Sequence, residues 1–252
     1  MTRPREAPER KPHADLDIDS RHLKAVKIER LLGLKPSDRP IRLLEIGTGS
    51  GVIAHHFATH PELACEVSAV DLVDQRMLSD GYHFELVEGT RLPFEDSDFD
   101  VILSNHVIEH VGDEDDQRAH LDEIHRVMDI GGVAYLATPN RWALIEPHFR
   151  VPLLSWLPRR LRDLYVELWR RGDRYDCEPL SGGRLHRLLT EAGFEYRGLE
   201  AEALRVANEI EPSSPRLNSV VRRLAVPVLD NVRSVSPTLV CLLSAPGISD
   251  AS

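Results

Sequence analysis

Residues 43–58 read LLEIGTGSGVIAHHFA, and this stretch decides the fold. An apolar segment that contains Glu45 leads into a turn with glycine at positions 47, 49 and 51, and an apolar helical pattern follows. Glycine adopts positive φ without strain, and its missing Cβ lets a ligand approach the backbone. A strand, a glycine-rich turn and a helix in this order predict the first ligand-binding turn of an open parallel sheet.

The alternation of strands and helices continues along most of the chain, which predicts an α/β fold with a doubly wound, mostly parallel, seven-stranded, Rossmann-like sheet. We expect one helix from Ser20, as its N-cap, to Gly33, and another over residues 116–128 that Gly131 and Gly132 close. Further helices are expected over residues 52–59 and 181–193, and strands over residues 41–46, 65–72, 84–89, 101–105, 133–139, 195–201 and 237–245.

One segment breaks this alternation. Residues 141–180 contain prolines, many arginines and all three tryptophans, which indicates an insertion that forms a helical lid. We expect residues 19–246 to form one domain around it. Residues 1–18 and 247–252 are expected to be tails, the first of them mobile because it is charged and aperiodic.

The bulk composition excludes several classes of function. The chain has 252 residues and a net charge of −10, which argues against nonspecific binding of nucleic acid. No apolar run approaches the roughly 20 residues of a membrane span, and the first 17 residues lack the apolar centre of a signal peptide. We therefore expect a cytoplasmic protein. Its three distant cysteines predict reduced thiols rather than disulfides.

The glycine turn and the acidic residues around it indicate the kind of ligand. The dinucleotide motif needs glycine where Val52 stands, and no Gly-Lys-Ser/Thr of a phosphate-binding loop follows. Glu45, Asp71 and Glu88 all lie near the carboxyl ends of predicted strands, so we expect them around one crevice. They would repel a pyrophosphate. S-adenosylmethionine carries a sulfonium, an ammonium and one carboxylate, and its net positive charge fits this crevice.

Four motifs together resemble the class I S-adenosylmethionine-dependent methyltransferases that act on small molecules. They are EIGTGSG (45–51), Asp71, the segment 87–111 and the segment 125–140. The resemblance implies that Asp71 binds the ribose hydroxyls of S-adenosylmethionine and that Asn105 lies at the mouth of the site. It also implies that the methionyl group lies at Glu45, Gly47 and Gly49, with Thr48 and Gly51 in the same turn, and that the adenine lies at Glu88 and Gly89.

Histidines supply the candidates for catalysis. If the acceptor is a hydroxyl, a general base is needed, and His110 is the first candidate and His148 the second. His110 also fits a packing role beneath the cofactor, and His148 fits a turn. His56 and His60 lie one helical turn apart, but no third ligand or acidic partner is evident in the sequence, so we predict no metal site.

The helical part of the insertion, residues 151–171, allows two interpretations. Leu157, Leu161, Leu164, Tyr165, Leu168 and Trp169 share one side, and the arginines lie elsewhere. The pattern favours a lid over the acceptor pocket. The alternative is contact with an anionic lipid surface.

The expected function is methyl transfer from S-adenosylmethionine to a small-molecule, sugar or lipid-linked acceptor. The alternative is a protein that binds S-adenosylmethionine or S-adenosylhomocysteine without catalysis. No nucleic-acid partner is expected, because the chain is acidic and no Asn-Pro-Pro-Tyr or Asp-Pro-Pro-Tyr follows the fourth strand. The sequence does not fix the acceptor atom or the oligomeric state.

Overall fold

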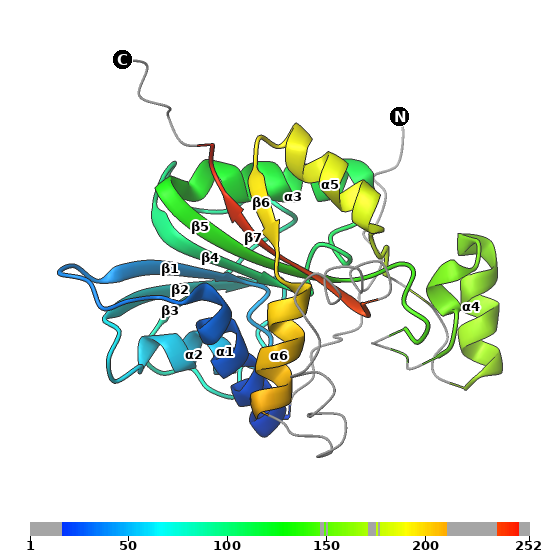
Figure 1. The fold of residues 1–252 in the computed structure, drawn as a ribbon, viewed down its shortest axis with the longest axis horizontal. Coiled ribbons are helices and arrows are strands. Elements are labelled where there is room, and N and C mark those ends of the chain that lie inside the picture. Colours follow the sequence, from blue (N-terminus) through cyan, green and yellow to red (C-terminus); the bar gives the residue numbers. More distant parts are fainter. Residues whose placement is uncertain are drawn as a thin grey trace.

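The central feature is a seven-stranded sheet with the order β3-β2-β1-β4-β5-β7-β6 (Figure 1). Neighbouring strands from β3 to β5 are parallel, whereas β7 is antiparallel to β5 and β6, which confirms the mostly parallel, doubly wound sheet. The computed structural model describes residues 17–146, 149, 151–170, 175, 177–210 and 236–246. The strands are β1 (Ile41–Ile46), β2 (Cys65–Asp71), β3 (His83–Leu86), β4 (Phe99–Asn105), β5 (Met128–Pro139), β6 (Glu195–Gly198) and β7 (Thr238–Ser244).

Helices cover both faces of the sheet (Figure 1). Two apolar clusters hold these layers: one joins α1, α2 and α6 to one face, and the other joins α3 and α5 to the opposite face. β1 and β4 are therefore covered on both sides, which explains their nearly continuous apolar sequences. The helices are α1 (Ile18–Leu32), α2 (Val52–Ala58), α3 (Glu114–Val127), α4 (Arg159–Leu168), α5 (Gly182–Glu191) and α6 (Glu200–Ile210). Within the described part of the chain, no helix has the length and apolar character needed to cross a bilayer.

The start of α1 differs from the prediction. Asp17, not Ser20, is the N-cap, and its carboxylate accepts a hydrogen bond from the Ser20 backbone N–H at 3.2 Å. Aspartate and serine are both good caps, so the sequence alone did not decide between them. Gly33 ends the helix in the left-handed conformation, as predicted. Of the expected tails, residues 1–16 and 247–252 lie outside the described residues, whereas Asp17 and Ile18, predicted to belong to the first tail, start α1.

Two other boundaries were also predicted wrongly. α3 begins after Asp113, which forms a capping box with Asp116, and it ends at Val127. β5 follows at once from Met128, so Gly131 and Gly132 lie within a strand instead of closing the helix. At the other edge of the sheet, β6 is only four residues long, because the chain turns into α6 at Glu200.

The insertion has a small apolar core of its own, and α4 lies apart from the two main layers (Figure 1). The predicted apolar side of the helix does not cover this core. Val166 and Arg162 are the buried residues of α4, and Arg162 is only 2% exposed. Leu161, Leu164, Leu168 and Trp169 are exposed, which contradicts a helix that buries its apolar side. The core of the insertion consists of Phe149, Val151, Leu154, Val166, Tyr175 and Cys177.

Candidate functional site

The turn between β1 and α2 requires glycine at two positions. Gly47 has φ of 76° and Gly51 has φ of 78°, in the left-handed region. A methyl group on Gly47 would lie 2.5 Å from Val107 Cγ2, and one on Gly51 would overlap the Leu78 carbonyl oxygen and the Tyr82 hydroxyl. The turn can therefore keep this shape only with glycine at both positions.

Asp71 is joined to this turn at the end of β2. One of its carboxylate oxygens accepts a hydrogen bond from the Gly49 backbone N–H at 2.8 Å, and the other accepts one from Leu72 N–H at 2.7 Å. Strand register explains why they meet, since Ile46 pairs with Val70 and leaves Asp71 beside the turn. The carboxylate is half-buried and retains lone pairs that can accept from a ribose diol.

Glu45 has a structural role that the sequence did not indicate. The side chain is buried, and its Oε2 accepts a hydrogen bond from the Ala54 backbone N–H at 2.9 Å. It thereby caps α2, whose N-cap residue, Gly51, has no side chain to do so. Burial raises the pKa of Glu45 to about 8, against the opposing charge of Arg21 on α1. The charge of Arg21 therefore acts on Glu45, an effect that the sequence did not indicate.

The structure brings the remaining predicted cofactor residues to the same edge of the sheet. Glu88 and Gly89 are exposed and follow β3 by two and three residues, so Glu88 does not end the strand as predicted. Thr48 is buried, and its hydroxyl donates to the Val70 carbonyl oxygen at 3.3 Å, so it stabilises the turn.

Asn105 carries a buried polar atom that needs a partner. It ends β4 next to Gly47, because Ile46 pairs with Ser104 in the adjacent strands. Its Oδ1 is buried and has no hydrogen-bond partner among the described residues. An unsatisfied buried acceptor costs about 1–3 kcal/mol, so a ligand with a hydrogen-bond donor would be stabilised at Asn105. The cofactor's ammonium is such a donor, and the chemistry of these residues fits S-adenosylmethionine.

A histidine and two polar partners lie directly beyond Asn105. His106 has φ of 60°, which is uncommon for a residue with a side chain and typical of functional sites. Its Nδ1 lies 3.2 Å from Glu109 Oε1, and the Thr138 hydroxyl donates to Glu109 Oε2 at 3.1 Å. The Glu109 side chain is fully buried, whereas that of His106 is 19% exposed. An acidic partner at Nδ1 leaves Nε2 of His106 as the acceptor nitrogen.

The two histidines predicted as bases have different positions. His110 lies in the turn after β4, five residues beyond its last residue, and its Nδ1 is 3.8 Å from Cys177 Sγ of the insertion. His148 lies outside the described residues. Neither His106 nor Glu109 was predicted as a catalytic residue, although their spacing of three residues was a usable signal in a turn.

The histidines of α2 have an acidic partner that the sequence did not reveal. Glu29 of α1 lies 2.7 Å from His56 Nε2 and 3.4 Å from His60 Nε2, so the three side chains form a cluster of potential metal ligands. However, His60 Nδ1 accepts backbone hydrogen bonds from Glu62 and Leu63. Nε2 of His60 therefore carries the proton and faces Glu29 at 3.4 Å, which is the reverse of the tautomer that a metal at Nε2 requires.

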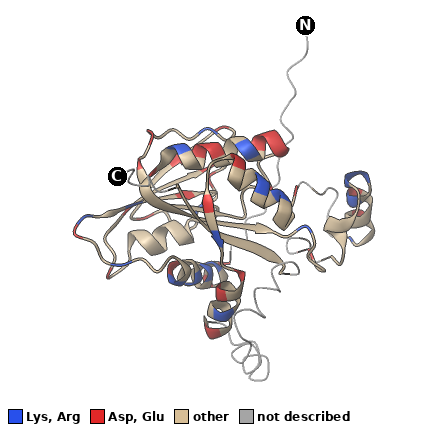
Figure 2. Cartoon of the chain, turned by 45° about the horizontal axis from the view of Figure 1, so that its top comes forward, with Lys and Arg blue, Asp and Glu red and all other residues tan. Residues whose placement is uncertain are grey.

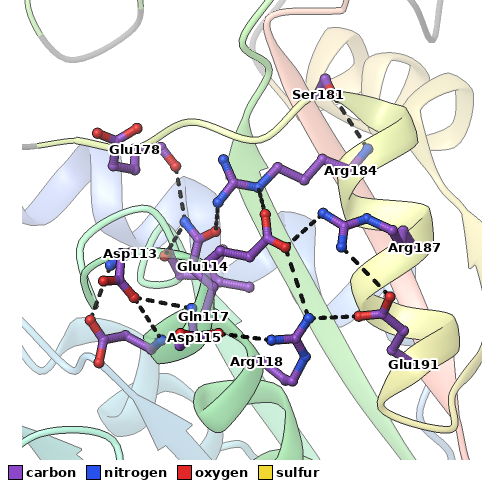
Figure 3. A network of polar contacts seen from close by, with 12 residues as sticks. Asp113, Glu114, Asp115, Gln117, Arg118, Glu178, Ser181, Arg184, Arg187 and Glu191 are labelled. Carbon is purple, nitrogen blue, oxygen red and sulfur yellow. Dashed lines mark hydrogen bonds and ion pairs between the residues drawn. The ribbon is translucent and has the colours of Figure 1, made fainter.

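A polar network fixes the loop after β4 to the insertion (Figure 3). The buried Gln117 donates from Nε2 to the carbonyl oxygens of Ile108, at 3.2 Å, and Glu178, at 3.1 Å. Arg184 of α5 donates to Gln117 Oε1 at 3.1 Å and also pairs with Glu114. Because the Glu178 N–H donates to the Glu109 carbonyl oxygen, this network holds the loop of the His106–Glu109 pair in place.

A separate hollow lies at the other end of the strands. It has a volume of about 300 Å³ and is lined by residues at the start of β1 and β4, including Arg39, Asp100 and Asp129. Arg39 and Arg42 both pair with Asp100, and Arg42 also pairs with Asp129. These charges neutralise one another, so the hollow does not compete with the crevice as a site for a charged ligand.

Comparison with known proteins identifies the family of the chain. The model of a methyltransferase-domain family matches residues 18–198. Two curated relatives, both named ubiquinone biosynthesis O-methyltransferase, come from Parvibaculum lavamentivorans and Ruegeria pomeroyi and are each 28% identical to the chain. The first alignment covers 49% of this chain and only 51% of the relative, and the second covers 71% and 70%.

The solved structures agree in fold. An S-adenosylmethionine-dependent methyltransferase from Mesorhizobium loti superimposes with a TM-score of 0.55 at 16% identity, over 88% of this chain and 99% of that one. Because the family model spans well over half of the sequence, the chain belongs to the methyltransferase-domain family.

Proposed function

We propose that this protein transfers a methyl group from S-adenosylmethionine to a hydroxyl oxygen of a small-molecule acceptor. The observation that carries the choice of oxygen is the His106–Glu109 pair, because a hydroxyl must lose a proton during transfer and a histidine held by a carboxylate can accept it. The names of the two curated relatives, which denote O-methyltransferases, support the same chemistry. A sugar or lipid-linked acceptor is compatible with it.

Different residues of the crevice bind different parts of S-adenosylmethionine. Asp71 accepts from the ribose hydroxyls, Glu88 and Gly89 lie where the adenine edge is expected, and the glycine turn supports the methionyl group. Asn105 Oδ1 accepts from the ammonium, since it is a buried acceptor that lacks a protein donor. Arg21, whose charge acts on Glu45, is our candidate partner for the cofactor's carboxylate.

When bound, S-adenosylmethionine supplies an electrophilic methyl group on its sulfonium. His106 Nε2 takes the proton of the acceptor hydroxyl, and the buried Glu109 carboxylate holds the ring in the required tautomer and stabilises the imidazolium. The crevice aligns the hydroxyl with the methyl group and excludes water. His110 and His148 stay as alternative bases, with His110 directed toward Cys177.

The acceptor is expected on the side of the insertion. Tyr175 is 7% exposed, and its hydroxyl has no hydrogen-bond partner among the described residues. Burial is the main cause that raises the pKa of Tyr175, and the charge of Glu146 adds more to the rise than that of Glu109 does. Tyr175 is thus our candidate for a hydrogen bond to the acceptor. Trp156 donates to the Ala143 carbonyl oxygen and shapes the same insertion.

The test uses a panel of small hydroxylated acceptors and three variants, His106→Gln, Glu109→Gln and His110→Gln. We expect His106→Gln to lower turnover by about 10² to 10⁴ and to remove the rise of rate with pH through a histidine ionisation. Glu109→Gln should lower turnover less, and His110→Gln should leave the pH profile in place. Affinity for S-adenosylmethionine, measured by calorimetry, should change little in all three. Normal turnover and an unchanged pH profile in His106→Gln would exclude this base.

A further inference from the structure

Exposed apolar side chains are concentrated in the insertion. Of the sixteen large hydrophobic residues that are exposed in the described part of the chain, nine lie between Trp142 and Trp169. Single exposed apolar residues are normal on a protein surface, but a group of them on one segment marks an interaction site.

The helix α4 carries the two most exposed members of this group, Leu164 and Leu168, on a side that does not join the core of the insertion as far as the described residues show. Leu161, Leu164 and Leu168 are 46%, 64% and 75% exposed, and their spacing of three and four residues places them on one face, with Trp169 next to them. Arg162 makes the inner contact instead, donating to the Leu157 carbonyl oxygen at 2.9 Å. None of the apolar clusters formed by the described residues includes the leucines of this outer face.

The net charge of α4 and the two residues that follow it is opposite in sign to that of the whole protein. Residues 159–170 contain four arginines and two acidic residues, whereas the chain has a net charge of −10 (Figure 2). Arg159 pairs with Glu178 at 3.0 Å, but Arg160 and Arg170 are exposed and have no ion-pair partner among the described residues. Arginines beside exposed leucines and a tryptophan are complementary to a surface that is both anionic and apolar.

We propose that α4 docks on the surface of an anionic lipid bilayer. Leu161, Leu164, Leu168 and Trp169 enter the region between headgroups and acyl chains, and Arg160 and Arg170 bind lipid phosphates. At ten residues, α4 is about 15 Å long, too short to cross the bilayer, so it lies in the plane of the membrane. Vesicle binding does not require turnover, so this proposal is tested independently of the O-methyltransferase assignment.

The fold connects this face to the crevice. Arg159 at the start of α4 pairs with Glu178, whose backbone N–H donates to the Glu109 carbonyl oxygen at 2.8 Å. A protein held by α4 would thus keep the insertion, and with it the expected acceptor side of the crevice, close to the lipid surface.

The experiment is flotation of the full chain with vesicles of phosphatidylcholine alone and of phosphatidylcholine with phosphatidylglycerol. We expect binding to the anionic vesicles and much weaker binding to the neutral ones. The double variant Leu164→Ser/Leu168→Ser should lower the partition coefficient at least about tenfold, because two apolar side chains no longer leave water. The matched control is Ile130→Ser/Leu204→Ser, which removes exposed apolar side chains at other places, 75% and 40% exposed, and should bind as the wild type does.

Further variants and measurements distinguish a lipid surface from other partners of this face. Arg160→Gln/Arg170→Gln should weaken binding to anionic vesicles only, and added salt should have the same effect on the wild type. No binding to anionic vesicles, or equal binding by the leucine double variant, would overturn the proposal. It would also be overturned if sedimentation showed a dimer that the leucine variant abolishes, because a second copy of the chain would then cover the face.

Discussion

Replacement of Asp71 by asparagine tests the geometry of the cofactor crevice. Each carboxylate oxygen of Asp71 accepts one short backbone hydrogen bond, at 2.8 Å from Gly49 and 2.7 Å from Leu72. Asparagine has nearly the same shape, but it replaces one charged acceptor by an NH₂ donor. A hydrogen bond to a charged group contributes about 1.5–3 kcal/mol, so the dissociation constant of S-adenosylmethionine should rise about 10- to 150-fold.

Calorimetry with both S-adenosylmethionine and S-adenosylhomocysteine makes this test specific. The two ligands share the ribose, so Asp71→Asn should weaken both by the same factor. A loss confined to S-adenosylmethionine would mean that Asp71 acts on the sulfonium charge instead. Asp74→Asn is the matched control, because Asp74 pairs with Arg76 on the same loop. Affinities of Asp71→Asn within twofold of the wild type would refute the assignment of Asp71 to the diol.

Three further predictions follow from other parts of the fold. Gly51→Ala should lower the free energy of unfolding by about 1–3 kcal/mol and raise the dissociation constant of S-adenosylmethionine more than tenfold. At Gly33 a methyl group meets no atom within 4 Å, so Gly33→Ala should lower the free energy of unfolding by only about 1 kcal/mol and leave binding unchanged. A cofactor ammonium near Glu45, whose pKa burial raises to about 8, should lower that pKa, so binding at pH 7 should release protons. Calorimetry in buffers of different ionisation enthalpy measures this proton release. If Glu45→Gln released as many protons as the wild type, Glu45 would not be their source. Burial lowers the pKa of His120 to about 4, so the unfolded chain binds more protons below pH 6.5. Urea titrations should therefore show that the wild type loses about 2 kcal/mol of unfolding free energy between pH 7 and 4.5, a loss that His120→Gln should not show.

The sequence predicted the sheet well because its signals are local. The apolar runs, the glycine turn and the position of Asp71 depend on strand and turn chemistry within a few residues, and the structure confirms all seven strands. Boundaries were less certain. Asp17 and Ser20 are equivalent as caps in sequence, and the end of α3 depends on Met128 pairing with Phe99 of β4, which no local pattern contains.

The parts of the site that the sequence missed are those created by contacts between distant segments. Glu29 approaches His56 and His60 only because α1 packs on α2, and Arg21, whose charge acts on Glu45, lies on the same helix α1. The outward orientation of the α4 leucines could not be predicted from the sequence either. A helical pattern identifies an apolar face, but it does not say whether that face turns to the protein or to its surroundings.

The central claim, methyl transfer to a hydroxyl oxygen, is tested most directly by the fate of the methyl group. The chain is incubated with methyl-¹³C S-adenosylmethionine and the panel of hydroxylated acceptors, and the product is identified by carbon NMR, with His106→Gln as the comparison. We predict that the wild type places the label on oxygen and that His106→Gln does so about 10² to 10⁴ times more slowly. Label on carbon or nitrogen, or S-adenosylmethionine that binds with no label transferred to any hydroxyl, would contradict the account.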